Sequence, residues 1–190
     1  MNKRIVTLIA LGALLLTTAP AQEKKPTDAA KPARTPSQEL MIGWQSVFGK
    51  LITMAQDFPQ EKYDFKAQKD QRTFGGNLIH VAADCFITLS SFTGAPAQSY
   101  ENEDSLVKKY ATKEEIVKLL SEAAKAGEQV IKDQGDAGLA KEVKYPWANA
   151  MVHGSFLLYG VIEHAGEHYG QLVVYYRLNG IVPPASRPRK

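Results

Sequence analysis

Two histidines, His164 and His168, stand four residues apart in the segment HAGEHYGQ. Residues at positions i and i+4 lie on the same face of an α-helix, so the two imidazoles can bind one transition-metal ion without distortion of the backbone. The spacing therefore predicts a metal site. It leaves two questions: which residue supplies a third ligand, and whether the site carries out a reaction or only binds.

The candidate for the third ligand is His80, in a second apolar helical segment, with Asp84 one turn later on the same face. A histidine ligand commonly donates its second ring N–H to a carboxylate, and Asp84 is placed to serve a neighbouring histidine in this way. Three neutral imidazoles and a water form an open catalytic site. Such a site suits Zn²⁺, Ni²⁺ or Fe²⁺, so the expected cofactor is one of these divalent ions.

Two more polar residues follow in the same segment. Glu167 is a candidate general base, fourth ligand or solvated surface charge, and Gln171 shares the helical line of His164, from which it could hydrogen-bond a ligand or an imidazole. Together with Asp84 they are the candidate catalytic residues. His153 precedes His164 by 11 residues, roughly 16 Å along a helix, which is too far to share one ion. We expect His153 to mark a helix start or to pack.

The order His164-x-x-Glu167-His168 also matches the inverzincin peptidase pattern. That class needs a mixed α/β scaffold and a distant acidic ligand, and the sequence has no strand-rich half to provide them. The plainest alternative is that the histidines are packing or surface residues and bind no metal.

Four segments with apolar residues at helical spacing must position these side chains. Ser37 is the expected N-cap of the first, and Thr112 with Glu115 forms a capping box at the third. Gly94 and Asn179-Gly180 are stop signals. Nothing between the segments predicts a convincing run of strands, so the fold class is all-α, a four-helix bundle. The helices are expected over residues 37–56, 73–92, 112–134 and, from a start near 147–149, to 178.

The linker between the second and third helices, residues 93–111, reaches roughly 60 Å when fully extended. It can cross the bundle, and helices two and three can therefore be parallel. Trp44 is expected to be a core residue, although it could line a pocket near the site. The single cysteine, Cys85, is expected to be a buried, inert thiol, which excludes an intramolecular disulfide.

The N-terminus has the pattern of a secretory signal. Lys3 and Arg4 precede an apolar run over residues 5–16, which is too short for a comfortable membrane span, and Ala19-Pro-Ala21 is a small-x-small cleavage site. We expect a signal peptide at 1–21, with an uncleaved anchor as the alternative. A flexible Lys/Pro/Ala-rich linker at 22–36 and one domain at 37–190 follow. The protein is then exported, periplasmic or secreted, with no stable membrane span after cleavage.

The charge balance excludes a common class of partner. Of 23 basic and 20 acidic side chains, cleavage removes only Lys3 and Arg4, which leaves 21 against 20. A nearly neutral chain gives no electrostatic case for nucleic acid. The expected partner is a small-molecule substrate.

Three stretches resemble the DinB/YfiT-like family, and the likeness spans roughly residues 37–184. They are YDFKA at 63–67, RTFGGNLIHVA at 72–82 and EHAGEHYGQLVVYYRLNGIVPP at 163–184. The resemblance implies an up-down-down-up bundle, a homodimer, and a central divalent metal held by His80, His164 and His168. One departure is Lys66-Ala67, where the family often has proline after the basic residue; it affects a loop and not the site.

The resemblance also implies a set of possible functions. Some relatives are metal-dependent transferases that use low-molecular-weight thiols, whereas others are hydrolase-like or isomerase-like. Because such thiols are mainly cytosolic, the expected export favours an exported metal-dependent enzyme with hydrolase-like or addition chemistry on a small molecule. The alternatives are a low-molecular-weight-thiol-dependent S-transferase with a thiol co-substrate, and a non-catalytic metal-binding or stress protein.

Overall fold

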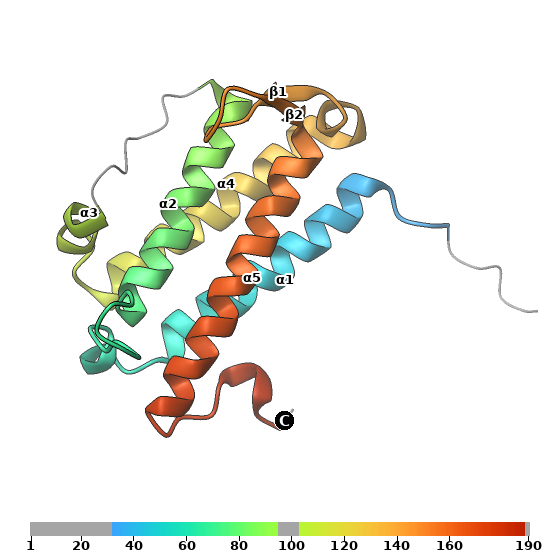
Figure 1. Cartoon of the computed structure of the whole chain (residues 1–190). Coiled ribbons are helices and arrows are strands. Elements are labelled where there is room, and N and C mark those ends of the chain that lie inside the picture. Colours follow the sequence, from blue (N-terminus) through green and yellow to red (C-terminus); the bar gives the residue numbers. More distant parts are fainter. Residues whose placement is uncertain (1–31, 95–102, 189–190) are drawn as a thin grey trace, which may run out of the picture. The chain divides into compact units, whose positions relative to one another are not determined.

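The computed structural model describes residues 32–94 and 103–188 (Figure 1). The expected signal peptide at 1–21 and most of the expected linker at 22–36 lie outside these residues. Within the described ranges, no helix combines the length and the apolar character needed to cross a membrane.

Four long helices form a bundle, as the sequence predicted: α1 (Pro36–Asp57), α2 (Phe74–Thr93), α4 (Lys113–Leu139) and α5 (Gly154–Leu178). Both α1 and α2 pack against α4 and α5. Figure 1 shows α2 and α4 running in the same direction and α1 and α5 running in the opposite one. The order is therefore up-down-down-up.

The helix starts follow from local capping chemistry, with one correction. Thr35, and not Ser37, is the N-cap of α1, and its backbone N–H donates to the Gln38 side chain at 3.1 Å. Pro36 occupies the first helical turn because it lacks an N–H that would otherwise be unpaired there. The capping box of α4 is confirmed, since Glu115 N–H donates to Thr112 Oγ1 at 3.2 Å and Thr112 N–H to Glu115 Oε2 at 3.0 Å.

The second and third helices also differ slightly from expectation at their ends. Thr73 caps α2 by accepting from Gly76 N–H at 2.9 Å, and Gly94 ends it in the left-handed region at φ 66°. Only glycine adopts that conformation without strain. The predicted third helix continues past residue 134 to Leu139, with a break at Gly135 (φ 53°).

The expected start of the last helix near 147–149 is wrong, because a short hairpin occupies this segment. Strands β1 (Glu142–Lys144) and β2 (Met151–His153) pair antiparallel, with Val143 opposite Val152. The helix begins only at Gly154. Three-residue strands are too short to give a readable alternation of polar and apolar residues, so periodicity did not predict them.

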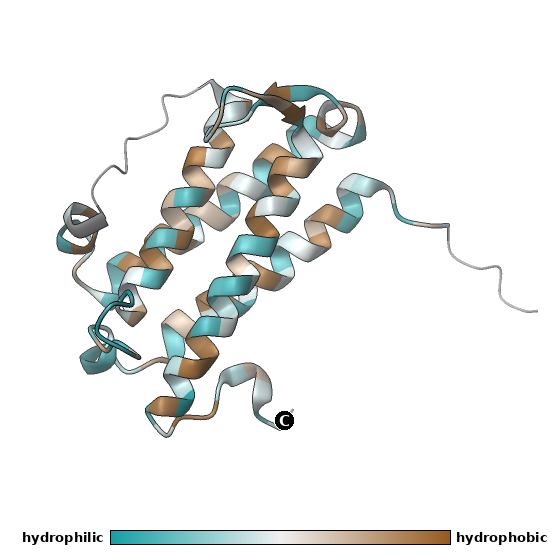
Figure 2. Cartoon of the chain, viewed as in Figure 1, coloured by the Kyte–Doolittle hydropathy of each residue, from teal (hydrophilic) through white to brown (hydrophobic). Residues whose placement is uncertain are grey.

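Three shorter elements complete the described chain. Helix α3 (Glu103–Lys109) lies within the long linker, and the 3₁₀ helices η1 (Gln60–Lys62) and η2 (Pro184–Ser186) follow α1 and α5. Figure 2 shows hydrophilic and hydrophobic positions interleaved along all four long helices, as expected for helices with one face against a core.

The core contains the two residues whose burial the sequence predicted. Trp44 is fully buried, its Nε1–H donates to Ala124 O at 2.9 Å, and it is not among the residues that line the cavity at His164. Cys85 is also fully buried, and burial raises the pKa of its thiol well above the usual range. Neither residue is placed to take part in chemistry.

Candidate metal centre

The three predicted histidines meet in the bundle, His80 from α2 and His164 and His168 from α5. Ring centroids are 5.1 Å apart for His80 and His164, 4.9 Å for His80 and His168, and 4.6 Å for His164 and His168. One ring nitrogen from each residue lies within 4.8 Å of the other two. Each nitrogen could bond a single ion at the usual distance of about 2.1 Å after small side-chain adjustments.

His168 is held in one orientation by a buried asparagine that the sequence analysis missed. Its Nδ1 lies 2.9 Å from Asn77 Oδ1, and it is only 4% exposed. Asn77 Nδ2 donates to Thr73 O at 3.0 Å and reaches the Tyr175 hydroxyl at 3.4 Å, which identifies Oδ1 as the acceptor toward His168. His168 therefore carries its proton on Nδ1, and the lone pair on Nε2 is left for a metal.

The same burial keeps His168 in the form that a metal requires. Desolvation, followed by the nearby charge of His164 and His80, lowers the pKa of His168 to about 4. At neutral pH the ring is thus uncharged. A neutral imidazole is the metal-binding form of histidine.

Asp84 links two of the rings to a neighbouring cavity. Its Oδ2 lies 3.0 Å from His164 Nε2 and 3.5 Å from His80 Nε2. Burial alone would raise the pKa of this carboxyl, but contact with His164 and the charges of the three imidazoles lower it below the usual value. Asp84 is therefore ionised at neutral pH, and it lies beside two of the imidazoles, where the sequence predicted a carboxylate.

His164 supplies a structural test of whether a cation fits. Its Nε2 is buried, lies 3.0 Å from Asp84 Oδ2 and has no hydrogen-bond partner among the described residues. An unpaired buried nitrogen is costly unless something outside the protein satisfies it. Three converging imidazoles, one of them with such a nitrogen, fit a divalent cation.

The other two candidate catalytic residues lie farther from the cluster. Glu167 Oε2 is 4.0 Å from His164 Nδ1, but its side chain is 61% exposed. Gln171 is exposed, and its side chain makes no hydrogen bond to the described part of the chain. Its helical phase matches that of His164, but it stands one turn beyond His168 and its side chain is exposed, although Tyr175 one turn later is buried. Glu167 fits a solvated outer contact better than a fourth ligand.

His153 is outside the cluster, as expected. It is the N-cap residue of α5, and its Nδ1 lies 2.8 Å from Ala140 O. This contact joins the hairpin to the end of α4 and leaves the fourth histidine of the chain with a structural role.

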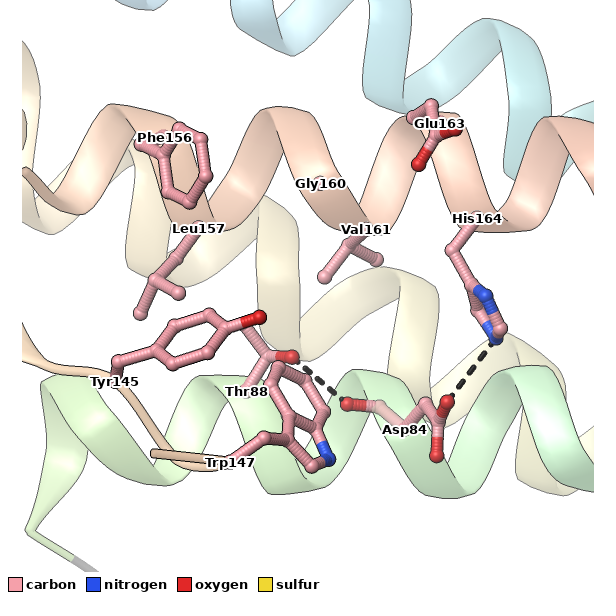
Figure 3. A pocket seen from close by; sticks show the side chains of 10 residues that line it. All are labelled: Asp84, Thr88, Tyr145, Trp147, Phe156, Leu157, Gly160, Val161, Glu163 and His164. Carbon is pink, nitrogen blue, oxygen red and sulfur yellow. Dashed lines mark hydrogen bonds and ion pairs between the residues drawn. The ribbon is translucent and has the colours of Figure 1, made fainter. Parts of the chain in front are cut away.

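A cavity of about 330 Å³ opens beside the cluster, and Asp84 and His164 form its inner end (Figure 3). Its remaining wall comes from Thr88 of α2, from α5 and from the turn of the hairpin. Helical periodicity did not predict this cavity, since it placed the start of the last helix at 147–149, within the turn. The lining side chains of the turn are Tyr145 and Trp147, and those of α5 include Phe156, Leu157 and Val161.

The fold and the cluster define this chain as a helical-bundle protein with a three-histidine candidate metal centre. The model of a protein family described as the DinB superfamily matches residues 45–172, a stretch that includes all three histidines. The chain belongs to the DinB superfamily, as its motifs indicated.

Solved structures share the fold at low sequence identity. A DinB-like protein from Bacillus cereus ATCC 10987 is 16% identical, with a TM-score of 0.64, and the match covers 77% of this chain and 95% of that chain. A mycothiol-dependent maleylpyruvate isomerase is 14% identical, with a TM-score of 0.58, over 73% of this chain and 61% of the isomerase. A protein from Escherichia coli UTI89 is 17% identical, with a TM-score of 0.59, over 76% and 95%. A search of curated proteins gives no match.

Replacing Asn77 by leucine should lower metal affinity about 10- to 100-fold, because His168 would lose the acceptor that fixes its ring and its tautomer. Competition with a chromophoric chelator measures the affinity. Asn77→Asp keeps an oxygen for His168 Nδ1–H and should restore most of the binding. Equal losses in both variants would mean that Asn77 only fills space.

Proposed function

We propose that this protein is a divalent-metal-dependent enzyme acting on a small molecule, with His80, His164 and His168 as the metal ligands. The observation that carries the proposal is the convergence of three imidazoles from two helices, one of which has a buried nitrogen with no hydrogen-bond partner among the described residues. Zn²⁺, Ni²⁺ and Fe²⁺ suit this donor set about equally.

A divalent cation held there would act as a Lewis acid and favour the ionised form of a water or thiol at the open position. Asp84 supplies the proton chemistry. Its carboxylate is ionised and faces both the cluster and the cavity (Figure 3), so it can accept a proton from a nucleophile that enters from the cavity side. Glu167 is a weaker candidate for this role, since most of its side chain is in solvent.

Asn77 and Tyr175 act through His168. The Tyr175 hydroxyl donates to Arg72 O at 2.6 Å and also lies near the Asn77 amide. This hydrogen-bonded chain extends from the start of α2 to α5 and holds the buried imidazole before a ligand arrives. Preorganisation of this kind lowers the free energy needed to assemble a site.

A thiol-dependent transferase is the second candidate. It is supported by the shared fold with a mycothiol-dependent isomerase. The export that we propose from residues 1–21 counts against it, because low-molecular-weight thiols are mainly cytosolic. In this alternative the thiol, and not water, would enter beside Asp84.

Metal analysis followed by an activity screen tests the proposal. The full-length gene is expressed, and the protein is purified from the exported fraction, where a first residue of Gln22 would agree with cleavage after Ala21. Wild-type protein should carry stoichiometric metal and His164→Ala should not. Absence of metal from both would remove the ligand assignment.

The screen then separates the candidates. Ester, amide and related small substrates are assayed with and without added thiols. Turnover without thiol supports the hydrolase-like function, and turnover that requires thiol supports the transferase. Asp84→Asn should keep the metal but lose about 10²- to 10⁴-fold in turnover. Full metal occupancy with no turnover in any assay would favour a non-catalytic metal-binding protein.

A further inference from the structure

Three aromatic side chains line the cavity beside Asp84. Tyr145 and Trp147 stand on the turn of the hairpin in an edge-to-face pair, with ring centroids 5.5 Å apart. Phe156 faces them from α5 (Figure 3). Trp147 is 52% exposed and Phe156 is 61% exposed. Large apolar side chains left open to solvent around a hollow mark a binding site, since an apolar ligand would cover them.

The two ends of the cavity differ in chemistry. Leu157 and the three aromatic residues form the outer part, whereas Asp84, Glu163 and His164 form the end toward the histidine cluster. Among the described residues that line the cavity, none is lysine or arginine. A molecule in this space therefore meets aromatic faces along its body and polar groups at one end.

The charges favour a neutral ligand. Two carboxylates, Asp84 and Glu163, line the inner end, beside the three imidazoles that would hold a divalent cation. With the cation bound, the formal charges cancel. Without the cation, the two carboxylates make the inner end of the cavity negative, and an anionic ligand would be repelled.

Gly160 sets the free space between the aromatic rings and the cluster. It lies on α5 one turn before His164 and lines the cavity. A Cβ atom built on Gly160 would meet no atom within 4 Å. A side chain there would enter the cavity without disturbing the fold.

We propose that this cavity binds a neutral small molecule with a flat, aromatic body and one polar head group, such as an aromatic alcohol, ester or amide. The proposal rests on the proposed function, because the head group lies toward Asp84 and the histidine cluster. Gly160 limits the size of the ligand, and the rings of Trp147 and Phe156 contact its flat body.

The chain contains its own reporter for this binding. It has two tryptophans; Trp44 is fully buried and hydrogen-bonded to Ala124 O, whereas Trp147 is half exposed in the cavity wall. Phenylacetamide, titrated into the full-length protein as purified, should therefore change Trp147 fluorescence and not that of Trp44. The change should disappear in Trp147→Phe.

Matched probes test the ligand class. Acetamide has the same head group without the ring and should bind at least about tenfold more weakly, because the aromatic walls contribute the apolar contact. After removal of metal with a chelator, phenylacetate should bind more weakly than phenylacetamide. Equal binding of acetamide and phenylacetamide, or no fluorescence response to any aromatic probe, would overturn the proposal.

A pair of glycine variants locates the site. Gly160→Leu should weaken phenylacetamide binding at least about tenfold by filling the cavity. Gly166→Leu is the control, since Gly166 is on the same helix, also has open space at its Cβ and does not line the cavity. Leucine favours helix over glycine, so both variants should fold. Equal affinities in the two variants would place binding elsewhere.

The probe-binding experiments and the metal analysis can fail independently of each other. Stoichiometric metal without probe binding would reject the aromatic ligand and leave the metal centre intact. Probe binding to a protein that takes up no metal would support the cavity and reject the metal-dependent enzyme.

Discussion

Replacing His80 by alanine should lower the affinity for Zn²⁺ at least about a hundredfold. His80 is the only ligand candidate that α2 contributes to the cluster, and one of its ring nitrogens lies within 4.8 Å of those of His164 and His168. Structural zinc sites in zinc-finger peptides contribute about 10–16 kcal/mol. Loss of one imidazole from three should therefore cost about 3 kcal/mol or more.

His153→Ala is the matched control for this prediction. The chain has four histidines, and His153 is the one outside the cluster, where it contacts Ala140 O. Its replacement should leave Zn²⁺ affinity within about twofold of the wild type. Competition with a chromophoric chelator, combined with metal analysis after dialysis, measures both variants. Similar affinities for His80→Ala and His153→Ala would show that the ion, if bound, is held by other residues.

Replacing Gly127 by alanine should destabilise the bundle by about 3 kcal/mol or more. Helices α1 and α4 approach each other closely at this residue, and a Cβ there would stand 1.8 Å from Trp44 Cζ2. The indole cannot move aside cheaply. Its Nε1–H is bonded to Ala124 O at 2.9 Å, and its ring stacks on Phe48 with centroids 4.6 Å apart.

The measurement is the free energy of unfolding from urea denaturation of the metal-free protein. Gly49→Ala is the control, because Gly49 is on α1 and a Cβ there would meet nothing within 4 Å. That change should be neutral or stabilise by up to about 1 kcal/mol, as expected for glycine to alanine in a helix. A Gly127→Ala variant as stable as Gly49→Ala would mean that the two helices can separate at little cost.

Local patterns were sufficient for much of the metal hypothesis. His164 and His168 share a face in any α-helix, so their pairing required no knowledge of the fold. The relation of Asp84 to His80 is local in the same way. The capping box of Thr112 and Glu115 and the glycine stop at Gly94 involve only neighbours in the chain, and the structure confirms them.

Some features depend on residues that are far apart in sequence. The hydrogen bond from His168 to Asn77 joins residues 91 positions apart. Asn77 did carry a signal, since a buried amide in an apolar helix needs a partner, but its partner could not be named without the packing of α2 on α5. The hairpin gave still less signal, because Tyr145 and Trp147 become a cavity wall only when the turn folds back over α5.

The sequence by itself determined that the chain forms long amphipathic helices and carries two imidazoles on one helical face, because both properties repeat with the 3.6-residue turn. Only the tertiary structure decided that His80 joins them, that Asn77 selects the tautomer of His168, and that Glu167 and Gln171 face solvent. The physical reason is that burial and hydrogen-bond partners in a bundle depend on how whole helices pack, and helical phase restricts that packing without fixing it.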